Sequence, residues 1–189
     1  MGRTCSEANK TSTDLLTHTM EKQHQWLLDE QVRVRFLMVD PPRDKSNMPT
    51  APALQLAGHS CAGKIKLCNA RERILSGGID VVLEVDAPAW KNFDKKRREA
   101  LLDHELTHVE PKRDAAGATL HDETGRALLF LKPDDYLVTG FYEVALRHEE
   151  MSLEVVSLGR LLVQGEIGQL VFDFCEKHPK AADTEEEAA

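Results

Sequence analysis

The chain has 189 residues, of which 41% are hydrophobic and 30% charged, and this composition is typical of one globular domain with tails. Its 24 basic and 32 acidic residues give a net charge of −8, which excludes the broad basic surface of a protein held to nucleic acid mainly by phosphate contacts. No apolar run approaches the roughly 18 residues of a membrane span, and the first residues contain no apolar signal-peptide core. We therefore expect a soluble, cytoplasmic protein with free thiols at Cys5, Cys61, Cys68 and Cys175.

The first half of the chain combines one helical pattern with several strand patterns. Residues 1–12 are polar and aperiodic, and we expect them to be disordered. A helix is predicted from Thr13 onward, with its apolar spacing interrupted at His24. Alternating or continuous apolar runs then predict strands at residues 31–40, 64–67 and 79–86.

The second half opens with a helix and a hairpin. Asp94 is a suitable N-cap for a helix over residues 95–110, because this span contains no Gly or Pro, and Pro111 is expected to end it. A Glu-Thr-Gly turn within residues 121–132 predicts a hairpin.

The end of the chain is predicted to be helical and then disordered. Helical spacing continues from Pro133 to about residue 174, which predicts additional C-terminal helices. Residues 176–189 form a polar acidic tail that we expect to be solvated. The domain is therefore expected to span residues 13–175.

The most informative motif is HExxH, which lies on the helix predicted over residues 95–110. A separation of four residues places His104 and His108 one turn apart on the same helical face, so both imidazoles can reach one Zn²⁺. Glu105 follows the first of them and projects beside the metal. There it can take a proton from a water held by the metal and later pass it to the leaving amine. The motif thus predicts a zinc hydrolase.

A catalytic zinc site needs a third protein ligand, and the residues alone leave this ligand open. Residues 110–113 do not supply the histidine of the short metzincin pattern. The remaining candidates lie further along the chain: His121, Asp134, Asp135, Glu143 and His148. The two aspartates are at the start of the next predicted helix, where the chain can fold back over the motif. Asp103, beside His104, is expected either to orient a ligand or to meet solvent.

The segment around the motif resembles a known family. Residues 80–109, DVVLEVDAPAWKNFDKKRREALLDHELTHV, are similar to the Putative phage metallopeptidase family, zincin-like proteins of bacteriophages and prophages. The resemblance extends upstream to KIKLCNARERILSGG and downstream to LKPDDY and FYEVALRH, so it covers roughly residues 30–150. It implies a compact α/β (α+β) domain of zincin type, with a small mixed sheet packed on the HExxH helix.

The resemblance also has implications for cofactor, substrate and ligands. It implies Zn²⁺, peptide or protein substrates and a site of action in the cytoplasm of the bacterial host cell. Family members often carry His-Asp after the hairpin, where this chain has Asp134-Asp135. Asp134 occupies the histidine position, and since a carboxylate can also bind zinc, we favour it as the third ligand beside His104 and His108.

Two functions follow from this sequence. The first is a zinc-dependent metallopeptidase with Glu105 as general base and acid, in which the strand at residues 79–86 is an edge that pairs with an extended substrate. The alternative is a catalytically inactive zincin-fold protein that binds a host or phage partner, which the altered Asp134 position and the extra helices suggest. A protease acting at DNA is disfavoured by the net acidity.

Other residues have structural interpretations. The spacing of Cys61, Cys68 and His59 matches no zinc template, so we interpret the two cysteines as buried structural thiols. Trp90 is expected to fill core space beneath the motif helix. No functional role is predicted for His24, which has no partner in the sequence pattern.

Overall fold

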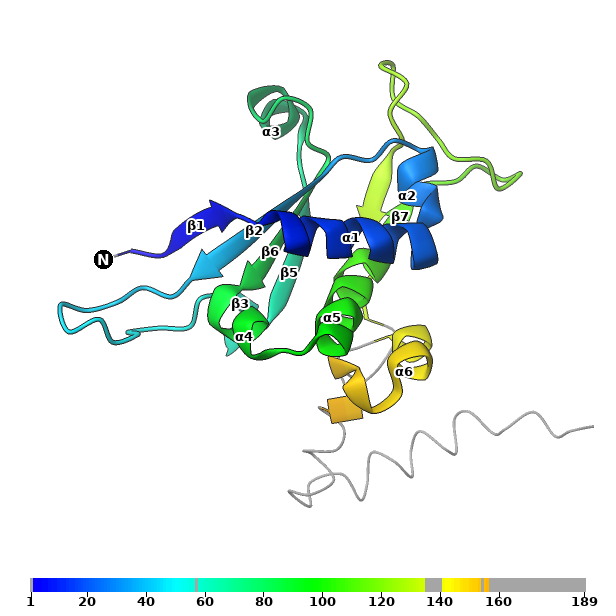
Figure 1. The fold of residues 1–189 in the computed structure, drawn as a ribbon. Helices are drawn as coiled ribbons and strands as arrows, with labels where there is room; N and C mark the ends of the chain where they lie inside the picture. Colours follow the sequence, from blue (N-terminus) through cyan, green and yellow to red (C-terminus); the bar gives the residue numbers. More distant parts are fainter. Residues whose placement is uncertain (1, 57, 135–140, 154, 157–189) are drawn as a thin grey trace, which may run out of the picture.

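The architecture is built on a four-stranded mixed sheet. In the computed structural model, which describes residues 2–56, 58–134, 141–153 and 155–156, the strand order is β1-β2-β6-β5. These strands are β1 (Thr4–Glu7), β2 (Val34–Asp40), β5 (Gly63–Leu67) and β6 (Val81–Asp86). The two central strands are parallel, and each outer strand is antiparallel to its neighbour (Figure 1). The prediction of an α+β domain with a small mixed sheet is confirmed.

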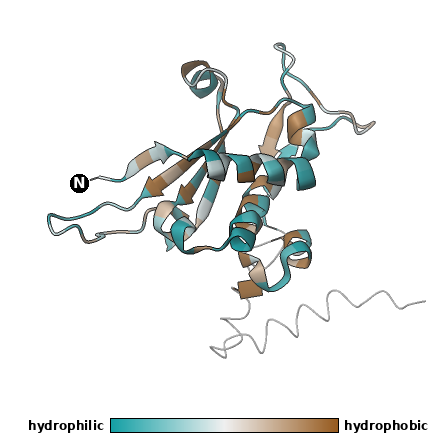
Figure 2. Cartoon of the chain, viewed as in Figure 1, coloured by the Kyte–Doolittle hydropathy of each residue, from teal (hydrophilic) through white to brown (hydrophobic). Residues whose placement is uncertain are grey.

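The core lies between this sheet and two long helices, α1 (Lys10–Gln23) and α5 (Lys95–Thr107). Every second residue of β6 is fully buried, as expected for a strand whose alternate side chains face the helices. Trp90, on the short helix α4 (Ala87–Asn92), is buried in this core and its indole donates a hydrogen bond to Ser12. Hydrophobic residues accordingly follow the strands in Figure 2, whereas the visible side of α1 is mostly hydrophilic.

The N-terminal part of the fold differs from the prediction in two ways. The segment predicted to be disordered, residues 1–12, is ordered over most of its described part, because Thr4–Glu7 pair with β2 and helix α1 already begins at Lys10, capped by Asn9. The predicted helix is also divided at His24 into α1 and α2 (Gln25–Asp29). His24 leaves helical geometry there and turns its side chain into the protein interior.

Helix α5 begins as predicted but ends earlier. Asp94 caps it by accepting a hydrogen bond from the backbone N–H of Arg97. The helix ends at Thr107 rather than near residue 110, because Val109–Pro111 form strand β7, which pairs with β8 (Leu129–Leu131). Pro111 therefore lies in a strand and does not end the helix.

The predicted edge strand is an interior strand. Residues 81–86 form β6, which is bonded to β2 on one side and to β5 on the other. The expectation that this strand offers a free edge to substrate is wrong, because residues 63–67 occupy that edge. Among the described strands, β5 and β1 are the outer members of the main sheet.

Several smaller elements complete the described chain. The sequence contains overlooked signals for two of them: an Asn69/Glu72 capping box begins α3 (Ala70–Leu75), and Asp86 with Pro88 begins α4. The predicted turn is present, with Asp122 accepting from the N–H groups of Thr124 and Arg126. The strand after it does not pair within residues 121–132 beyond one bridge at Ala127, because β8 pairs with β7 instead. The others are β3 (Gln55–Leu56), β4 (His59–Ser60), α6 (Tyr142–His148) and the 3₁₀ turn η1 (Glu149–Met151).

The end of the chain is only partly covered. Helix α6 confirms part of the helical prediction, but it begins at Tyr142, and Pro133 and Asp134, the predicted helix start, are not helical. Most of the remaining helical prediction and the tail at residues 176–189 lie outside the described residues. Within the described part of the chain, no helix is both long and apolar enough to cross a membrane.

Candidate metal centre

The two histidines of the HExxH motif lie together at the C-terminal end of α5. His104 is in the last turn of the helix and His108 is its C-cap residue, still with helical backbone angles. Their ring centroids are 5.1 Å apart with the ring planes nearly perpendicular. Both side chains are mostly buried. The i, i+4 spacing therefore produces the predicted pair of neighbouring imidazoles.

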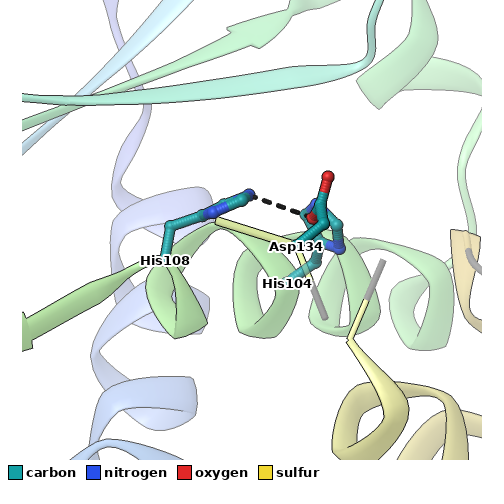
Figure 3. A group of neighbouring side chains, drawn as sticks. All are labelled: His104, His108 and Asp134. Atoms are coloured by element: carbon teal, nitrogen blue, oxygen red, sulfur yellow. Dashed lines mark ion pairs between the residues drawn. The ribbon is translucent and has the colours of Figure 1, made fainter. Parts of the chain in front are cut away.

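The β7–β8 pairing brings Asp134 to these histidines. Strand β7 leaves the helix directly after His108, and β8 returns antiparallel to it. Beyond the last strand pair, the Lys132 N–H donates to the His108 carbonyl at 2.7 Å, and His108 Nδ1 lies 2.7 Å from the Lys132 carbonyl. Asp134 follows two residues later, so the hairpin places it against the end of the helix (Figure 3).

The three side chains converge on a common point. Asp134 Oδ1 lies 3.7 Å from His108 Nε2 and 4.0 Å from His104 Nε2. One ligand atom from each residue lies within 4.8 Å of the other two, and among the described residues this is the one group of His, Cys, Asp and Glu with such geometry. Two atoms that are each about 2.1 Å from one ion can be at most about 4.2 Å apart. The two measured separations to Asp134 are below that limit.

The hydrogen bonds in the site also suit a cation. The Lys132 carbonyl can accept only from a protonated His108 Nδ1, which leaves the lone pair of Nε2 directed at the site. Asp134 Oδ1 is buried and has no hydrogen-bond donor among the described residues. A buried carboxylate oxygen in this state is costly unless a positive charge is bound there. Two imidazole nitrogens and one carboxylate oxygen therefore fit a divalent metal ion.

An aromatic ring covers one side of the two imidazoles. Phe141, which immediately precedes α6, is fully buried, and its ring centroid lies 4.6 Å from that of His108 and 5.2 Å from that of His104. Lys132 Nζ lies 5.4 Å from the centroid of the same ring. The ring thus packs against both imidazoles on one side and shields that side from solvent.

Glu105 is buried beside the histidine pair, on the side of α5 that meets the sheet. A Cβ atom at Gly63, the first residue of β5, would be 2.5 Å from Glu105 Oε1 and 2.9 Å from Leu101 Cδ1. Any larger residue at this position would displace the carboxylate. The absence of a side chain at Gly63 therefore allows Glu105 to pack directly against the edge strand.

Comparison with known families identifies the family of this chain. The sequence model of the family described as Putative phage metallopeptidase matches residues 4–171. The chain belongs to this family. The matched residues include His104, His108 and Asp134, and the family name implies a metal cofactor and a peptide or protein substrate. Neither the curated proteins nor the solved structures give a significant match.

The other described residues that the sequence offers as ligands do not reach the candidate metal centre. His121 is bonded to Glu30 at 2.8 Å, and this hydrogen bond is the main reason why the pKa of Glu30 is lowered. Glu143 is exposed and faces Arg147. His148 is directed at Asp103 instead, and Asp135 lies outside the described residues.

Asp103 occupies a site that the sequence pattern does not predict. It is fully buried, so of the two alternatives that the sequence leaves open, contact with solvent is excluded. Its carboxylate is 2.8 Å from His24 Nε2 and 2.8 Å from His148 Nε2, and it accepts two hydrogen bonds from Arg147 at 2.8 and 2.9 Å. Burial raises the pKa of Asp103, but the hydrogen bonds from these three residues outweigh it and hold the pKa far below its usual range. His24 thus has a structural partner that the sequence does not reveal.

Proposed function

We propose that the protein is a zinc-dependent metallopeptidase of phage or prophage type. In this proposal His104, His108 and Asp134 bind Zn²⁺, and Glu105 is the general base and acid. The observation that supports it best is the convergence of one donor atom from each of these three residues. One of these atoms, Asp134 Oδ1, is buried and has no hydrogen-bond donor among the described residues. The family name agrees with the reaction class.

Zinc is favoured over harder cations because two of the three donors are imidazole nitrogens. Three protein ligands leave one coordination position for water or substrate, as in other catalytic zinc sites. When bound, zinc would supply Lewis-acid polarisation of the scissile carbonyl and would make water a better nucleophile at neutral pH.

Glu105 moves the proton in this scheme. Its carboxylate takes a proton from the attacking water and gives it to the nitrogen of the leaving amine, so no net proton is gained or lost by the enzyme. Its burial next to His104 keeps the carboxylate in a fixed orientation, and Gly63 provides the space that it needs. His108 keeps the tautomer that its hydrogen bond to the Lys132 carbonyl requires.

We further propose that β5 is the strand along which an extended substrate binds. Among the described strands β5 pairs only with β6, and its first residue touches Glu105. Pairing to a strand edge recognises the main chain of a peptide with little demand on its sequence. This placement would put a backbone amide beside the general base.

Metal analysis and one substitution test the proposal. Purified protein should contain one zinc per chain, and Glu105→Gln should keep the zinc but lose hydrolysis of an unfolded protein substrate. Glu110→Gln, on the neighbouring strand β7, is the matched control and should retain both properties. Retained hydrolysis in the Glu105 variant would remove Glu105 from the mechanism. Bound zinc without cleavage of any substrate by the wild type would favour the alternative of an inactive binding protein.

A further inference from the structure

We propose that helix α6 positions the metal ligands: Phe141 fixes the orientation of both imidazoles, and Asp103 holds Phe141 in place by anchoring Arg147 and His148. This inference rests on the proposed metal site and adds residues that are outside the HExxH motif. Phe141, Arg147 and Asp103 are assigned here as positioning residues, because none of them reaches the donor atoms themselves.

The first contact between α5 and α6 is the Phe141 ring. It is tilted against the His104 ring by 58° and nearly perpendicular to the His108 ring, at 72°. A single buried ring therefore restricts the side-chain rotation of both predicted ligands. His108 has a second restraint in the Lys132 carbonyl. Residues that orient metal ligands in this way commonly influence metal affinity by about 10–100-fold.

The second contact is formed by Asp103, the residue directly before His104. Its two carboxylate oxygens each accept one hydrogen bond from the Arg147 guanidinium, and Oδ2 also lies 2.8 Å from His148 Nε2. Planar bidentate pairs of this kind fix orientation as well as distance. Arg147 is six positions after Phe141, about 9 Å along a helix. The two helices are thus joined at two separated points, which prevents α6 from rotating about either one.

The contact between Asp103 and Arg147 is connected to the proposed metal site along both helices. On α5 the anchor and the ligand are adjacent, Asp103 and His104. On the α6 side the anchor and the aromatic ring are the two ends of one short helix. If the Arg147 contact is lost, His148 alone joins α6 to Asp103, and we expect the Phe141 ring to hold the imidazoles less firmly. The effect of Arg147 on the metal should therefore require Phe141.

The experiment measures zinc affinity by competition with a chelator, together with the visible absorption spectrum of the Co²⁺-loaded protein. Phe141→Leu keeps an apolar side chain but removes the ring, and should weaken zinc binding by about 10–100-fold and alter the Co²⁺ spectrum. Arg147→Met should weaken binding by about tenfold, the lower end of that range. The double variant should be no weaker than Phe141→Leu alone, because both changes act through one contact. Leu146→Ala is the matched control, since Leu146 is on the same helix and 60% exposed.

Three outcomes would overturn the inference. Wild-type affinity and an unchanged Co²⁺ spectrum in Phe141→Leu would show that the ring is only part of the core. Additive losses in the double variant would show that Arg147 does not act through Phe141. A wild-type protein that binds no zinc would overturn the proposed function first, and this inference with it. If Phe141→Leu does not fold, Arg147→Met tests the inference alone, because unchanged zinc affinity and an unchanged Co²⁺ spectrum would contradict it.

Discussion

Two aspartates lie close to the histidines of the motif, and their surroundings are opposite. Asp103 is fully buried and its two oxygens meet hydrogen-bonding groups from His24, Arg147 and His148. Asp134 is partly buried, and its Oδ1 has no hydrogen-bond donor among the described residues, only two imidazole nitrogens at 3.7 and 4.0 Å. The same side chain therefore forms a satisfied ionic anchor at one site and an unsatisfied acceptor at the other.

The contrast explains why only one of them is a candidate ligand. A carboxylate whose lone pairs are already occupied by hydrogen-bond donors, among them a guanidinium, gains little by binding a cation and would lose its partners in doing so. A buried carboxylate oxygen without a donor costs about 1–3 kcal/mol or more, which a bound cation would offset. Asp103 should therefore contribute to the stability of the metal-free protein, and Asp134 to metal binding.

The largest expected effect is the loss of stability on removing the anchor. Asp103→Ala leaves the Arg147 guanidinium and two histidines around an empty site, and should lower the free energy of unfolding by about 3–5 kcal/mol. Urea denaturation in the presence of a chelator measures this quantity without a metal contribution. Glu143→Ala is the control, because Glu143 also faces Arg147 but its side chain is 76% exposed. Its loss should cost less than about 1 kcal/mol. Equal losses in the two variants would contradict the assignment of Asp103 as the anchor.

Asp134→Ala should show the reverse behaviour. Without this ligand we expect zinc affinity to fall at least about 100-fold, which corresponds to roughly 2.7 kcal/mol. The stability of the metal-free protein should be unchanged or slightly higher, because a buried oxygen without a donor is removed. Chelator competition and urea denaturation on the same preparation separate the two quantities. A variant that keeps wild-type zinc affinity would exclude Asp134 as a ligand.

The histidine pair was predictable from the sequence because its geometry is local. A separation of four residues on a helix places two side chains on one face, independently of the rest of the fold. The strand pattern of residues 79–86 and the Asp94 cap are local in the same sense, and the structure confirms both. Asp134 depends on the antiparallel return of β8 beside β7, so the residues alone gave five alternatives and only the family resemblance favoured one.

The elements that the sequence did not predict depend on distant contacts. Strand β5, and not β6, is at the edge of the sheet because β5 pairs with β6. The periodicity of side chains within one strand does not reveal which strand it pairs with. Residues 1–12 are polar, yet Thr4–Glu7 form a strand because the edge of β2 is available to them. The role of Asp103 needs residues 79 positions before it and 44 positions after it. A pattern within one helix contains no sign of those partners.

A smaller effect should separate the contribution of Asp103 to stability from its contribution to zinc affinity. His24 contacts Asp103 from the junction of α1 and α2 and is not part of α6. His24→Leu should therefore lower the free energy of unfolding by about 1–3 kcal/mol, since Asp103 loses one partner, while the zinc affinity stays at the wild-type value. His18→Leu, at an exposed position of α1, is the control for both measurements. A large loss of zinc affinity in His24→Leu would mean that the whole network, and not only its α6 side, orients the ligands.

Glu105 is a third carboxylate near the motif histidines, and its position depends on the space left by the missing side chain of Gly63. The space next to Gly63 is occupied by the carboxylate itself, so Gly63→Ala should push Glu105 away from its place while His104, His108 and Asp134 remain together. A misplacement of about 1 Å can reduce a rate by about 10²-fold. The flexible glutamate can relax part of the overlap, so we expect kcat to fall about tenfold with zinc affinity unchanged. Lys45→Ala, at an exposed loop position outside the main sheet, should leave kcat at the wild-type value. Reduced zinc affinity in Gly63→Ala would show instead that β5 supports the ligands, and that Glu105 does not depend on this strand separately from them.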